Sequence, residues 1–404
     1  MPSRAPAGHD RRPARVGCRA PCVAASRPRT RRMRLTPTLQ QPDAAVGPTG
    51  DVDVSVLVPV LDEAAGIAEA AEAMLAQDVD GVVEFLFVDG GSTDGSVAIL
   101  ERLADRDPRV RVLENPGRTV PRGLNVGLRA ARGRYVARMD AHTVYAPDYL
   151  RHGVERLAAG DVDWVSGPPV PVGRGRWSSL VSVALGSGLG RGASDKWGAE
   201  DGTGAPEELE LTTSVFAGVW RRGTLDALGG WDAEWDVNED SEMAARLLAD
   251  GGRLVSRTEM AAGYTPRDSL RGLARQYGAY GRFRAKTFVR HPTSAGPLRV
   301  ATALLPVVLA SSALPGRPGR GARGATGAYA LLLAGQAART APRPSQVAPL
   351  AAVLGTMHVA FAAGFLRGLV VHGPRRRALR ASAPRPIVRP AGPRHAGTDR
   401  ELAA

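Results

Sequence analysis

The chain has 404 residues, 44% hydrophobic and 23% charged, so it can bury a sizeable core and is not a wholly disordered protein. The net charge of +13 is uneven: residues 1–50 carry +8, residues 296–373 carry +7, residues 374–404 carry +6 and residues 51–295 carry −8. Because the excess arginine lies outside the acidic body, and largely in Pro-rich tails, we expect no nucleic-acid partner. An acidic body that handled a diphosphate would need a divalent cation to offset the repulsion.

Charge and hydropathy divide the chain into four expected parts. These are a disordered Arg/Pro-rich leader (1–50), a folded α/β domain (51–295), an apolar membrane-associated helical region (296–373) and a disordered basic tail (374–404). Cys18 and Cys22 both lie in the leader, and a lone C-x3-C pair predicts neither a zinc site nor a disulfide.

Short apolar, β-branched runs alternate with helical spacing in the folded body. The pattern predicts strands over 52–60, 82–88, 110–113 and 134–139, and helices that begin at 62 and extend over 96–104 and 125–131. This alternation indicates a mostly parallel α/β sheet with right-handed crossovers. Ligands bind beyond the carboxyl ends of such strands, where four acids collect: Asp62, Glu63, Asp89 and Asp140.

An acid and a histidine follow the last of these strands, in Arg138-Met139-Asp140-Ala141-His142. In an extended backbone, residues two apart share a face, so Asp140 and His142 would project together beyond the sheet edge. Such a pair suits a metal ion or a diphosphate. An ordinary boundary between a strand and a loop explains the same residues, and the stretch alone does not decide between the two.

The second half of the body is less regular. Residues 173–208 are Gly-rich and predict a mobile loop or lid. A strand is expected over 213–220, and a helix with an acidic first turn begins near Ser241. Three tryptophans could stack on an acceptor sugar, although aromatic residues near turns are more often core anchors: Trp220, Trp231 and Trp235.

Beyond residue 295 the chain becomes apolar. The segments 298–314 and 325–338 are short, whereas 347–366 is long enough to cross a bilayer. The connectors 315–324 and 339–346 are both basic, so charge does not orient any span. An interfacial hairpin and a soluble helical subdomain remain alternatives to full crossings.

Five motifs in fixed order carry more information than any one of them. They are Val58-Pro59-Val60-Leu61-Asp62-Glu63, Phe87-Val88-Asp89-Gly90-Gly91-Ser92, Arg122-Gly123-Leu124-Asn125, Arg138-Met139-Asp140-Ala141-His142 and Asn238-Glu239-Asp240. Together they resemble the family 2 inverting glycosyltransferases, whose GT-A fold is a Rossmann-like, mostly parallel sheet with flanking helices. Within this family the chain is most similar to the bacterial succinoglycan and exopolysaccharide group. The resemblance covers about Val52 to Pro292 and implies that 51–295 is a GT-A glycosyltransferase domain.

The resemblance implies a role for each matching residue on the donor side. Pro59 and Glu63 match the loop that lines the nucleotide, and Asp89 matches the acid that contacts uracil. Arg122 falls where a basic residue helps to anchor the nucleotide, although Arg118 is close enough to compete.

The resemblance also implies a metal site and a catalytic base. Asp140 matches the first acid of the family's Asp-x-Asp element, and His142 stands where the second acid would be. These two would hold a divalent metal, Mn²⁺ or Mg²⁺, of which imidazole suits Mn²⁺ better. Asp240 matches the base that takes the acceptor's proton, with Glu239 and Glu242 as reserve candidates.

A basic face is expected on the helix that follows. Its residues are Arg271, Arg275, Arg282 and Lys286. The resemblance implies a helix that closes over the donor diphosphate, to which Arg275 and Gln276 would contribute. The Gln-x-x-Arg-Trp motif of processive synthases is absent, which disfavours polymerisation. A basic amphipathic helix on anionic lipid explains the same face.

The resemblance therefore implies a membrane-associated, metal-dependent, inverting sugar transferase. Its donor would be a nucleotide-diphosphate sugar, with UDP the expected nucleotide. Its acceptor would be a lipid-linked or growing glycan of exopolysaccharide or cell-envelope synthesis, at the cell membrane with the catalytic domain on the cytoplasmic face. The alternative is a non-catalytic protein that binds a nucleotide sugar or glycan within a membrane assembly, which the histidine at position 142 favours.

Overall fold

The computed structural model describes residues 52–192, 194–197, 207–212, 215–294 and 302–387. The expected leader (1–50) with both cysteines, residues 388–404 of the expected basic tail, and residues 193 and 198–206 of the expected lid lie outside these residues. The described part of the tail contains the helix Arg376–Ala381, and that of the lid contains the helices Arg176–Gly186 and Gly188–Arg191, so the predictions of disorder and of an irregular loop are wrong there.

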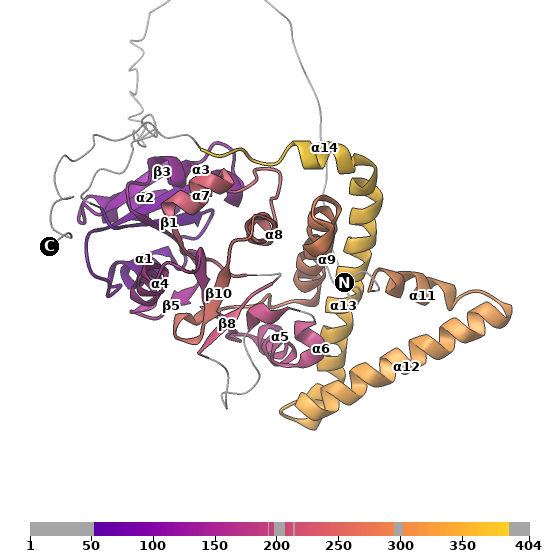
Figure 1. Cartoon of the computed structure of the whole chain (residues 1–404). Helices are drawn as coiled ribbons and strands as arrows, with labels where there is room; N and C mark the ends of the chain where they lie inside the picture. The colour runs from indigo at the N-terminus through magenta and orange to yellow at the C-terminus, as the bar shows by residue number, and fades with distance from the viewer. Residues whose placement is uncertain (1–51, 193, 198–206, 213–214, 295–301, 388–404) are drawn as a thin grey trace, which may run out of the picture. The chain divides into compact units, whose positions relative to one another are not determined.

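The strands form an eight-stranded sheet and a three-stranded sheet (Figure 1). In chain order they are β1 (Val54–Val60), β2 (Val83–Asp89), β3 (Val110–Glu114), β4 (Tyr135–Arg138), β5 (Val144–Tyr145), β6 (Trp164–Ser166), β7 (Pro169–Pro171), β8 (Glu208–Glu210), β9 (Gly218–Arg221), β10 (Leu254–Arg257) and β11 (Ala262–Tyr264).

The large sheet has the order β3-β2-β1-β4-β9-β6-β10-β8, and the small one has the order β5-β11-β7. The strands β3, β2, β1 and β4 are parallel, while β9 runs antiparallel to both β4 and β6. In the register of this parallel half, Val60 pairs with Asp89 and Leu57 pairs with Arg138. The carboxyl ends of β1, β2 and β4 therefore meet at one edge, where ligands of such sheets bind.

Helices flank these strands (Figure 1). They are α1 (Ile67–Leu75), α2 (Ser96–Ala104), α3 (Val120–Ala130), α4 (Tyr149–Ala158), α5 (Arg176–Gly186), α6 (Gly188–Arg191), α7 (Arg222–Leu228), α8 (Glu239–Ala249), α9 (Leu270–Arg290), α11 (Leu305–Ser311), α12 (Gly316–Thr340), α13 (Val347–His372) and α14 (Arg376–Ala381).

The central strand β1 is buried on both faces, as its nearly unbroken apolar sequence predicts. Because side chains alternate along a strand, Val56 and Val58 enter the cluster that α1 and α2 cover. Leu57 enters the cluster that α3, α7 and α8 cover, which also holds Trp220. The two clusters form the core on either side of the sheet and fix the strand ends that carry the site.

The structure confirms the predicted mostly parallel α/β sheet, and α2 has the predicted bounds. Several boundaries differ from the prediction. The strand β1 ends at Val60 as predicted but begins at Val54 instead of residue 52, and the first helix begins at Ile67 instead of residue 62. The helix α3 begins at Val120 instead of residue 125, because Pro121 in its first turn has the backbone angle that a helix start needs. The connector predicted over 315–324 is wrong, since these residues fall almost entirely within the first turns of α12.

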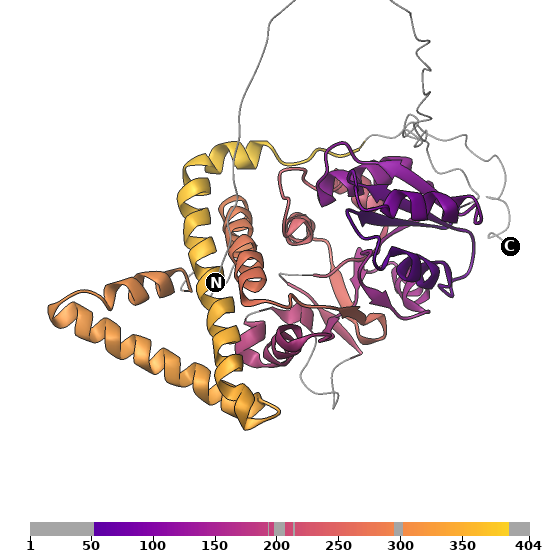
Figure 2. The ribbon, with the colours of Figure 1, turned by 180° about the vertical axis from the view of Figure 1, so that it is seen from behind.

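Glycines let α9 and α13 approach closely, side by side in both views (Figures 1 and 2). A Cβ atom at Gly281 of α9 would lie 2.0 Å from the Phe361 carbonyl oxygen, and one at Gly364 of α13 would lie 2.1 Å from the Gly278 oxygen. A side chain at either position would push the helices apart, so α13 packs directly on α9, a helix of the predicted domain 51–295.

One described helical stretch, Pro344–Ala381, which includes α13, is long and apolar enough to cross a membrane. Within its most apolar window, 33% of the residues are buried inside the protein. The segment Thr302–Ser311 is apolar but shorter. Of the three apolar segments that the sequence contains, only the last therefore remains a candidate span, as predicted.

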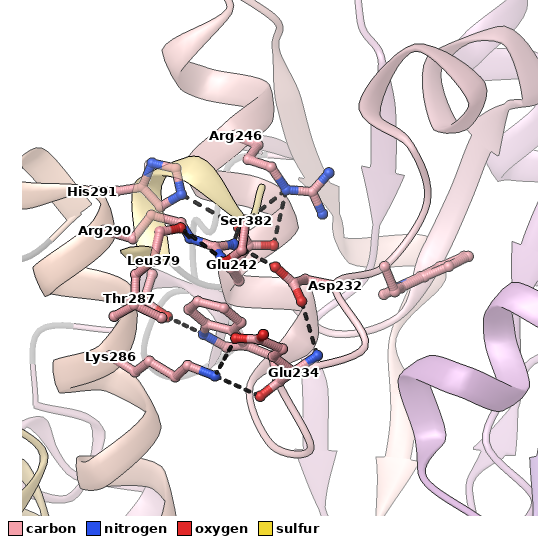
Figure 3. A network of polar contacts seen from close by, with 12 residues as sticks. Asp232, Glu234, Glu242, Arg246, Lys286, Thr287, Arg290, His291, Leu379 and Ser382 are labelled. Carbon is pink, nitrogen blue, oxygen red and sulfur yellow. Dashed lines mark hydrogen bonds and ion pairs between the residues drawn. The ribbon is translucent and has the colours of Figure 1, made fainter. Parts of the chain in front are cut away.

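A buried network of charges joins α8, α9 and the C-terminal segment (Figure 3). Arg290 Nη1 lies 2.5 Å from Asp232 Oδ2 and 2.9 Å from Glu242 Oε1, and all three side chains are at most 5% exposed. Arg290 also donates from Nε to the Leu379 carbonyl and from Nη2 to Ser382 Oγ. The network holds the loop before α8, and hence the start of α8, against α9 and α14.

Candidate active site

The loops after β1 and β2 are tied together where their strands end. The hydrogen bonds are Asp62 N to Ser92 Oγ (2.9 Å), Glu63 N to Ser96 Oγ (2.8 Å), Ala64 N to Asp94 Oδ2 (2.8 Å) and Thr93 N to Asp62 Oδ1 (2.7 Å). Since each loop supplies partners for the other, the two loops form one polar surface beside Pro59.

Asp89, the predicted nucleotide contact, is buried and braces its own loop. Its Oδ2 accepts a hydrogen bond from Gly91 N (2.8 Å) and its Oδ1 accepts one from Ser92 Oγ (2.5 Å). A Cβ at Gly91 would lie 3.0 Å from the guanidinium of Arg118, which therefore lies over this loop. Arg122 packs instead against Gly117.

Arg138, the last residue of β4, joins three carboxylates. Its Nε lies 2.8 Å from Asp140 Oδ1, and its Nη1 lies 2.7 Å from Glu239 Oε1 and 2.9 Å from Asp240 Oδ1. The Arg138 side chain is 8% exposed. The acid after β4 and the two acids at the start of α8, about a hundred positions apart in sequence, are thus brought to one place.

The first turn of α8 presents the other two carboxylates. Asn238 precedes it in the left-handed conformation (φ 60°, ψ 30°), which asparagine tolerates better than most residues, and donates from Nδ2 to the Tyr280 carbonyl. Asp240 Oδ1 also accepts a hydrogen bond from Trp231 Nε1 (3.2 Å). The positive end of the helix dipole favours carboxylates at Glu239 and Asp240.

Burial and charge act in opposite directions on these acids. Burial would raise the pKa of Asp140, but Arg138 and His142 hold it below its usual value. For Glu239, burial and the nearby Asp240 outweigh Arg138 and raise the pKa to about 7. A single guanidinium therefore does not fully balance three buried carboxylates.

The pH dependence of stability should reveal the raised pKa of Glu239. Because this pKa is about 7 in the folded protein and 4.5 ordinarily, the folded state holds the proton more tightly, and stability is lost as pH rises from about 4.5 to about 7. In Glu239→Gln the group does not titrate, so the loss should shrink by about 2–3 kcal/mol. Thermal melting of both proteins between pH 4.5 and 7.5 tests this; parallel curves would contradict it.

His142 does not extend along a strand with Asp140, contrary to the prediction. The strand ends at Arg138, and residues 140–143 turn, with Thr143 N donating to the Asp140 carbonyl. The two side chains nevertheless interact, since Asp140 helps to raise the pKa of His142 after the larger effect of its hydrogen bond to Glu63. That bond, from His142 Nδ1 to Glu63 Oε1 (3.0 Å), links the end of β4 to the loop after β1.

No three His, Cys, Asp or Glu side chains among the described residues form a ready-made metal site. Asp140 and His142 still fit a cation that takes its remaining ligands from a phosphate, as Mg²⁺ commonly does. Within the described residues, Asp140 Oδ2 and His142 Nε2 have no hydrogen-bond partner. One carboxylate oxygen and one ring nitrogen therefore remain for such an ion.

Lys196, in the short helix Asp195–Trp197, lies near the same carboxylates. Burial first, and then the charge of Arg284, lower its pKa to about 8, whereas Asp240 and Glu239 raise it. Its ammonium lies 5.2 Å from the centre of the Trp197 ring. Among the described residues Lys196 forms no ion pair. Its ammonium is therefore a second positive charge near these acids, in addition to Arg138.

The basic face predicted on α9 does not act as one surface. Arg275 is exposed, but Gln276 donates from Nε2 to Tyr264 Oη (3.2 Å). Lys286 is buried, 3.9 Å from the centre of the Trp235 ring, and donates to the Glu234 carbonyl. The helix turns these residues to different sides because its C-terminal half packs into the protein.

The structure decides two further alternatives. The three tryptophans are at most 1% exposed and serve the core, the more common role for aromatic residues near turns, so they do not stack on an acceptor: Trp220, Trp231 and Trp235. Glu242 is fully buried beside His291, Arg246 and Arg290. Burial alone would raise the pKa of Glu242, but these partners lower it to about 2, so it is a poor proton acceptor.

Sequence reasoning missed the role of Arg138 and the position of Lys196. A charged residue that interrupts the apolar run Tyr135–Arg138 was the available signal for Arg138, since a buried arginine needs anionic partners. No comparable pattern surrounds Lys196, which approaches the site only through tertiary packing.

Known proteins resemble this chain along most of its length. The model of glycosyl transferase family 2 matches residues 55–184. The succinoglycan biosynthesis protein ExoA of Rhizobium meliloti (strain 1021) is 33% identical over 319 residues, which cover 78% of this chain and 94% of that protein. The succinoglycan biosynthesis protein ExoO of the same organism is 38% identical over 109 residues, which cover 26% of this chain and 30% of that protein.

A solved structure shares the fold. The mannosyltransferase PcManGT from Pyrobaculum calidifontis, in complex with GDP-Man and Mn²⁺, superposes with a TM-score of 0.50 at 23% identity. The match covers 81% of this chain and 90% of that protein. At this identity the likeness establishes the GT-A fold, a Rossmann-like sheet with flanking helices, as the sequence predicts.

Proposed function

The chain belongs to glycosyltransferase family 2 and is an enzyme of that family, and from this premise we propose that it transfers a sugar with inversion from a nucleotide-diphosphate sugar to a glycan acceptor. The observation that supports this most is the convergence of Asp140, Glu239 and Asp240 on Arg138, at the sheet edge beside the loops of β1 and β2. A single displacement requires a base on one side of the sugar and a site for the leaving diphosphate on the other, and Asp240 and Asp140 would take these two roles.

Asp240 is the proposed catalytic base. The acceptor hydroxyl attacks the anomeric carbon while its proton passes to the Asp240 carboxylate, and the bond from that carbon to the diphosphate oxygen breaks. Asp240 is favoured over Glu239 because it matches the base of the family motif and because Arg138 Nη1 lies 2.9 Å from both of its oxygens, which holds the carboxylate in one orientation. The chemistry thus needs one ionised carboxylate next to the acceptor.

The donor side is formed by residues of β1, β2 and the loop after β3. We propose that Pro59 and Glu63 line the nucleotide and that Asp89 contacts its base, for which UDP is our expectation. Between the two arginines, the position of Arg118 over the Asp89 loop supports it more than Arg122, which packs on Gly117. Arg275 is exposed and remains the α9 residue proposed to reach the diphosphate, with Gln276 braced on Tyr264.

A divalent metal, Mn²⁺ or Mg²⁺, is the proposed cofactor, with Asp140 and His142 as its protein ligands. Bound there, it would stabilise the negative charge of the departing diphosphate. The solved mannosyltransferase was captured with Mn²⁺, and Asp140 Oδ2 has no hydrogen-bond partner among the described residues, which supports the assignment.

The proposed acceptor is a lipid-linked or growing glycan of an exopolysaccharide or cell-envelope polymer. The similarity to a succinoglycan biosynthesis protein and the candidate span in Pro344–Ala381 support a site at the cell membrane. We place the catalytic domain, 51–295, on the cytoplasmic face, where nucleotide sugars are made. Residues 296–373 would then attach it to the membrane.

A donor screen tests this function. Membranes containing the full chain would be incubated with UDP-, GDP- and dTDP-sugars, with Mn²⁺ or EDTA, and the released nucleotide measured. We expect release and a glycosylated lipid product with UDP-sugars and Mn²⁺ only. Release of GDP from a GDP-sugar would contradict UDP as the donor nucleotide, and activity in EDTA would contradict the requirement for a divalent metal. Binding without any product would favour the non-catalytic alternative.

A further inference from the structure

Arg138 stands between the donor side and the acceptor side of the proposed reaction. Its Nε is bonded to Asp140, the proposed metal ligand, and its Nη1 to Asp240, the proposed base, at 2.8 Å and 2.9 Å. Nη1 also lies 2.9 Å from the second oxygen of Asp240. A single buried side chain therefore fixes the distance between two groups that act on opposite sides of the sugar.

The backbone of Arg138 is itself fixed. It ends β4, where it pairs with Leu57 of β1 and Gly218 of β9, and the next residue, Met139, donates from N to the Leu57 carbonyl. Strands on both sides hold this position, unlike the loops that carry Asp140 and Glu63. A guanidinium on such a rigid element is a suitable reference point for the carboxylates around it.

The shape of the side chain matters as well as its charge. The rigid fork of a guanidinium can serve Asp140 with one nitrogen and the α8 carboxylates with another. A lysine ammonium is a single point charge and cannot reach both sides with the same geometry. If the residue served only to neutralise buried acids, lysine would replace it with little consequence for the reaction.

We propose that Arg138 is a positioning residue that couples Asp140 to Asp240, setting the base in place for the acceptor proton while it leaves one oxygen of Asp140 for the donor side. This inference rests on the proposed function. Arg138 touches neither the sugar nor the diphosphate in this account, and acts through the carboxylates.

The first test is the kinetics of Arg138→Lys. We expect kcat to fall about 100-fold, because a displaced base costs about this much, while the donor KM and the calorimetric affinity for UDP with Mn²⁺ stay within about threefold. In an Asp240→Asn background the same substitution should lower kcat by less than about threefold, since the base through which it acts is absent. Two outcomes would overturn the proposal. One is a double variant whose fold-loss in kcat equals the product of the two single losses, and the other is a kcat near wild type in Arg138→Lys alone.

Thermal melting provides a test that needs no activity. Arg138→Lys and Asp240→Asn are each expected to shift the melting temperature, and the shift of the double variant should differ clearly from the sum of the two. Additive shifts would show that the residues are not coupled. If the wild-type protein transfers no sugar although coupling is found, the proposed function fails and the coupling stands. If Arg138→Lys does not fold, Arg138→Gln with Glu239→Gln removes one charge of each sign and takes its place in both tests.

Discussion

Asp240→Asn is expected to lower kcat by about 10²–10⁴-fold, the usual contribution of a general base. Asparagine has nearly the same shape and retains an oxygen that can accept from Arg138 and from Trp231 Nε1. It cannot take the proton of the acceptor hydroxyl. The donor side does not involve this residue, so the affinity for UDP with Mn²⁺ should remain within a few fold of wild type.

The fold should survive the substitution. Three carboxylates face one guanidinium in the wild-type site, and removing one negative charge lessens their mutual repulsion. We therefore expect an unchanged circular dichroism spectrum and a melting temperature no lower than that of wild type.

Two matched variants make the kinetic result decisive. Asp161→Asn changes a carboxylate that is 51% exposed and pairs only with Arg156 and Arg253 among the described residues. This variant should leave kcat unchanged. Glu239→Gln should lower kcat less than Asp240→Asn does. A wild-type rate in a folded Asp240→Asn protein would contradict the assignment, and the reverse order of the two losses would make Glu239 the base.

The parallel half of the fold could be predicted from the sequence because its strands and helices are specified by patterns of neighbouring residues. β-branched runs such as that of β1 and helices such as Ser96–Ala104 follow from short-range pattern, and their alternation dictates parallel pairing. The acids at the strand ends follow from the same pattern, because strand order places them at one edge. That is why Asp89 and Asp140 could be placed at one edge of the sheet beforehand, whereas Asp240, in the first turn of α8, was named only from the resemblance to the family.

The antiparallel half could not be predicted in the same way. The short strand β9 lies between β4 and β6, and it is more than fifty residues from either in sequence. Local pattern carries no information about such pairing. In α12, by contrast, local sequence suggests the wrong structure. Its Gly- and Pro-rich start has low helix propensity and predicts a connector, yet these residues are helical. Neighbouring helices contact α12, and tertiary context overrides that weak preference.

Side-chain partners were the least predictable part of the site. Lys286 and Gln276 have the residue types and spacing of a diphosphate-binding helix, yet packing turns one toward Trp235 and the other toward Tyr264. Which face of α9 is buried depends on α13, whose position the local sequence does not encode. The same dependence hid the pairing of Arg138.

Arg290→Met is expected to destabilise the protein by about 3–5 kcal/mol, the usual cost of removing one partner from a buried ion pair. Methionine fills the space of the aliphatic part but leaves Asp232 and Glu242 buried next to each other without the cation between them (Figure 3). It also removes the donors to Leu379 and Ser382. The melting temperature should fall by roughly 10 °C.

The control is an exposed arginine that, like Arg290, pairs with two carboxylates. Arg253 bridges Asp161 and Glu210 but is 44% exposed, so Arg253→Met should cost less than about 1 kcal/mol. Comparing the two separates burial from the number of ion pairs. Equal melting temperatures for the two variants would show that the Arg290 network contributes no more than a surface pair.

Adding Asp232→Asn to Arg290→Met should recover part of the loss, because among the described residues Arg290 is the only ion-pair partner of the buried Asp232. The recovery should be incomplete, since Glu242 keeps only Arg246 and His291 and the donors to Leu379 and Ser382 remain lost. Because the network holds the loop that leads into α8, we also expect Arg290→Met to lower kcat while the double variant regains some of it. Stability recovered without any regain in kcat would mean that the network supports the fold but does not position the start of α8.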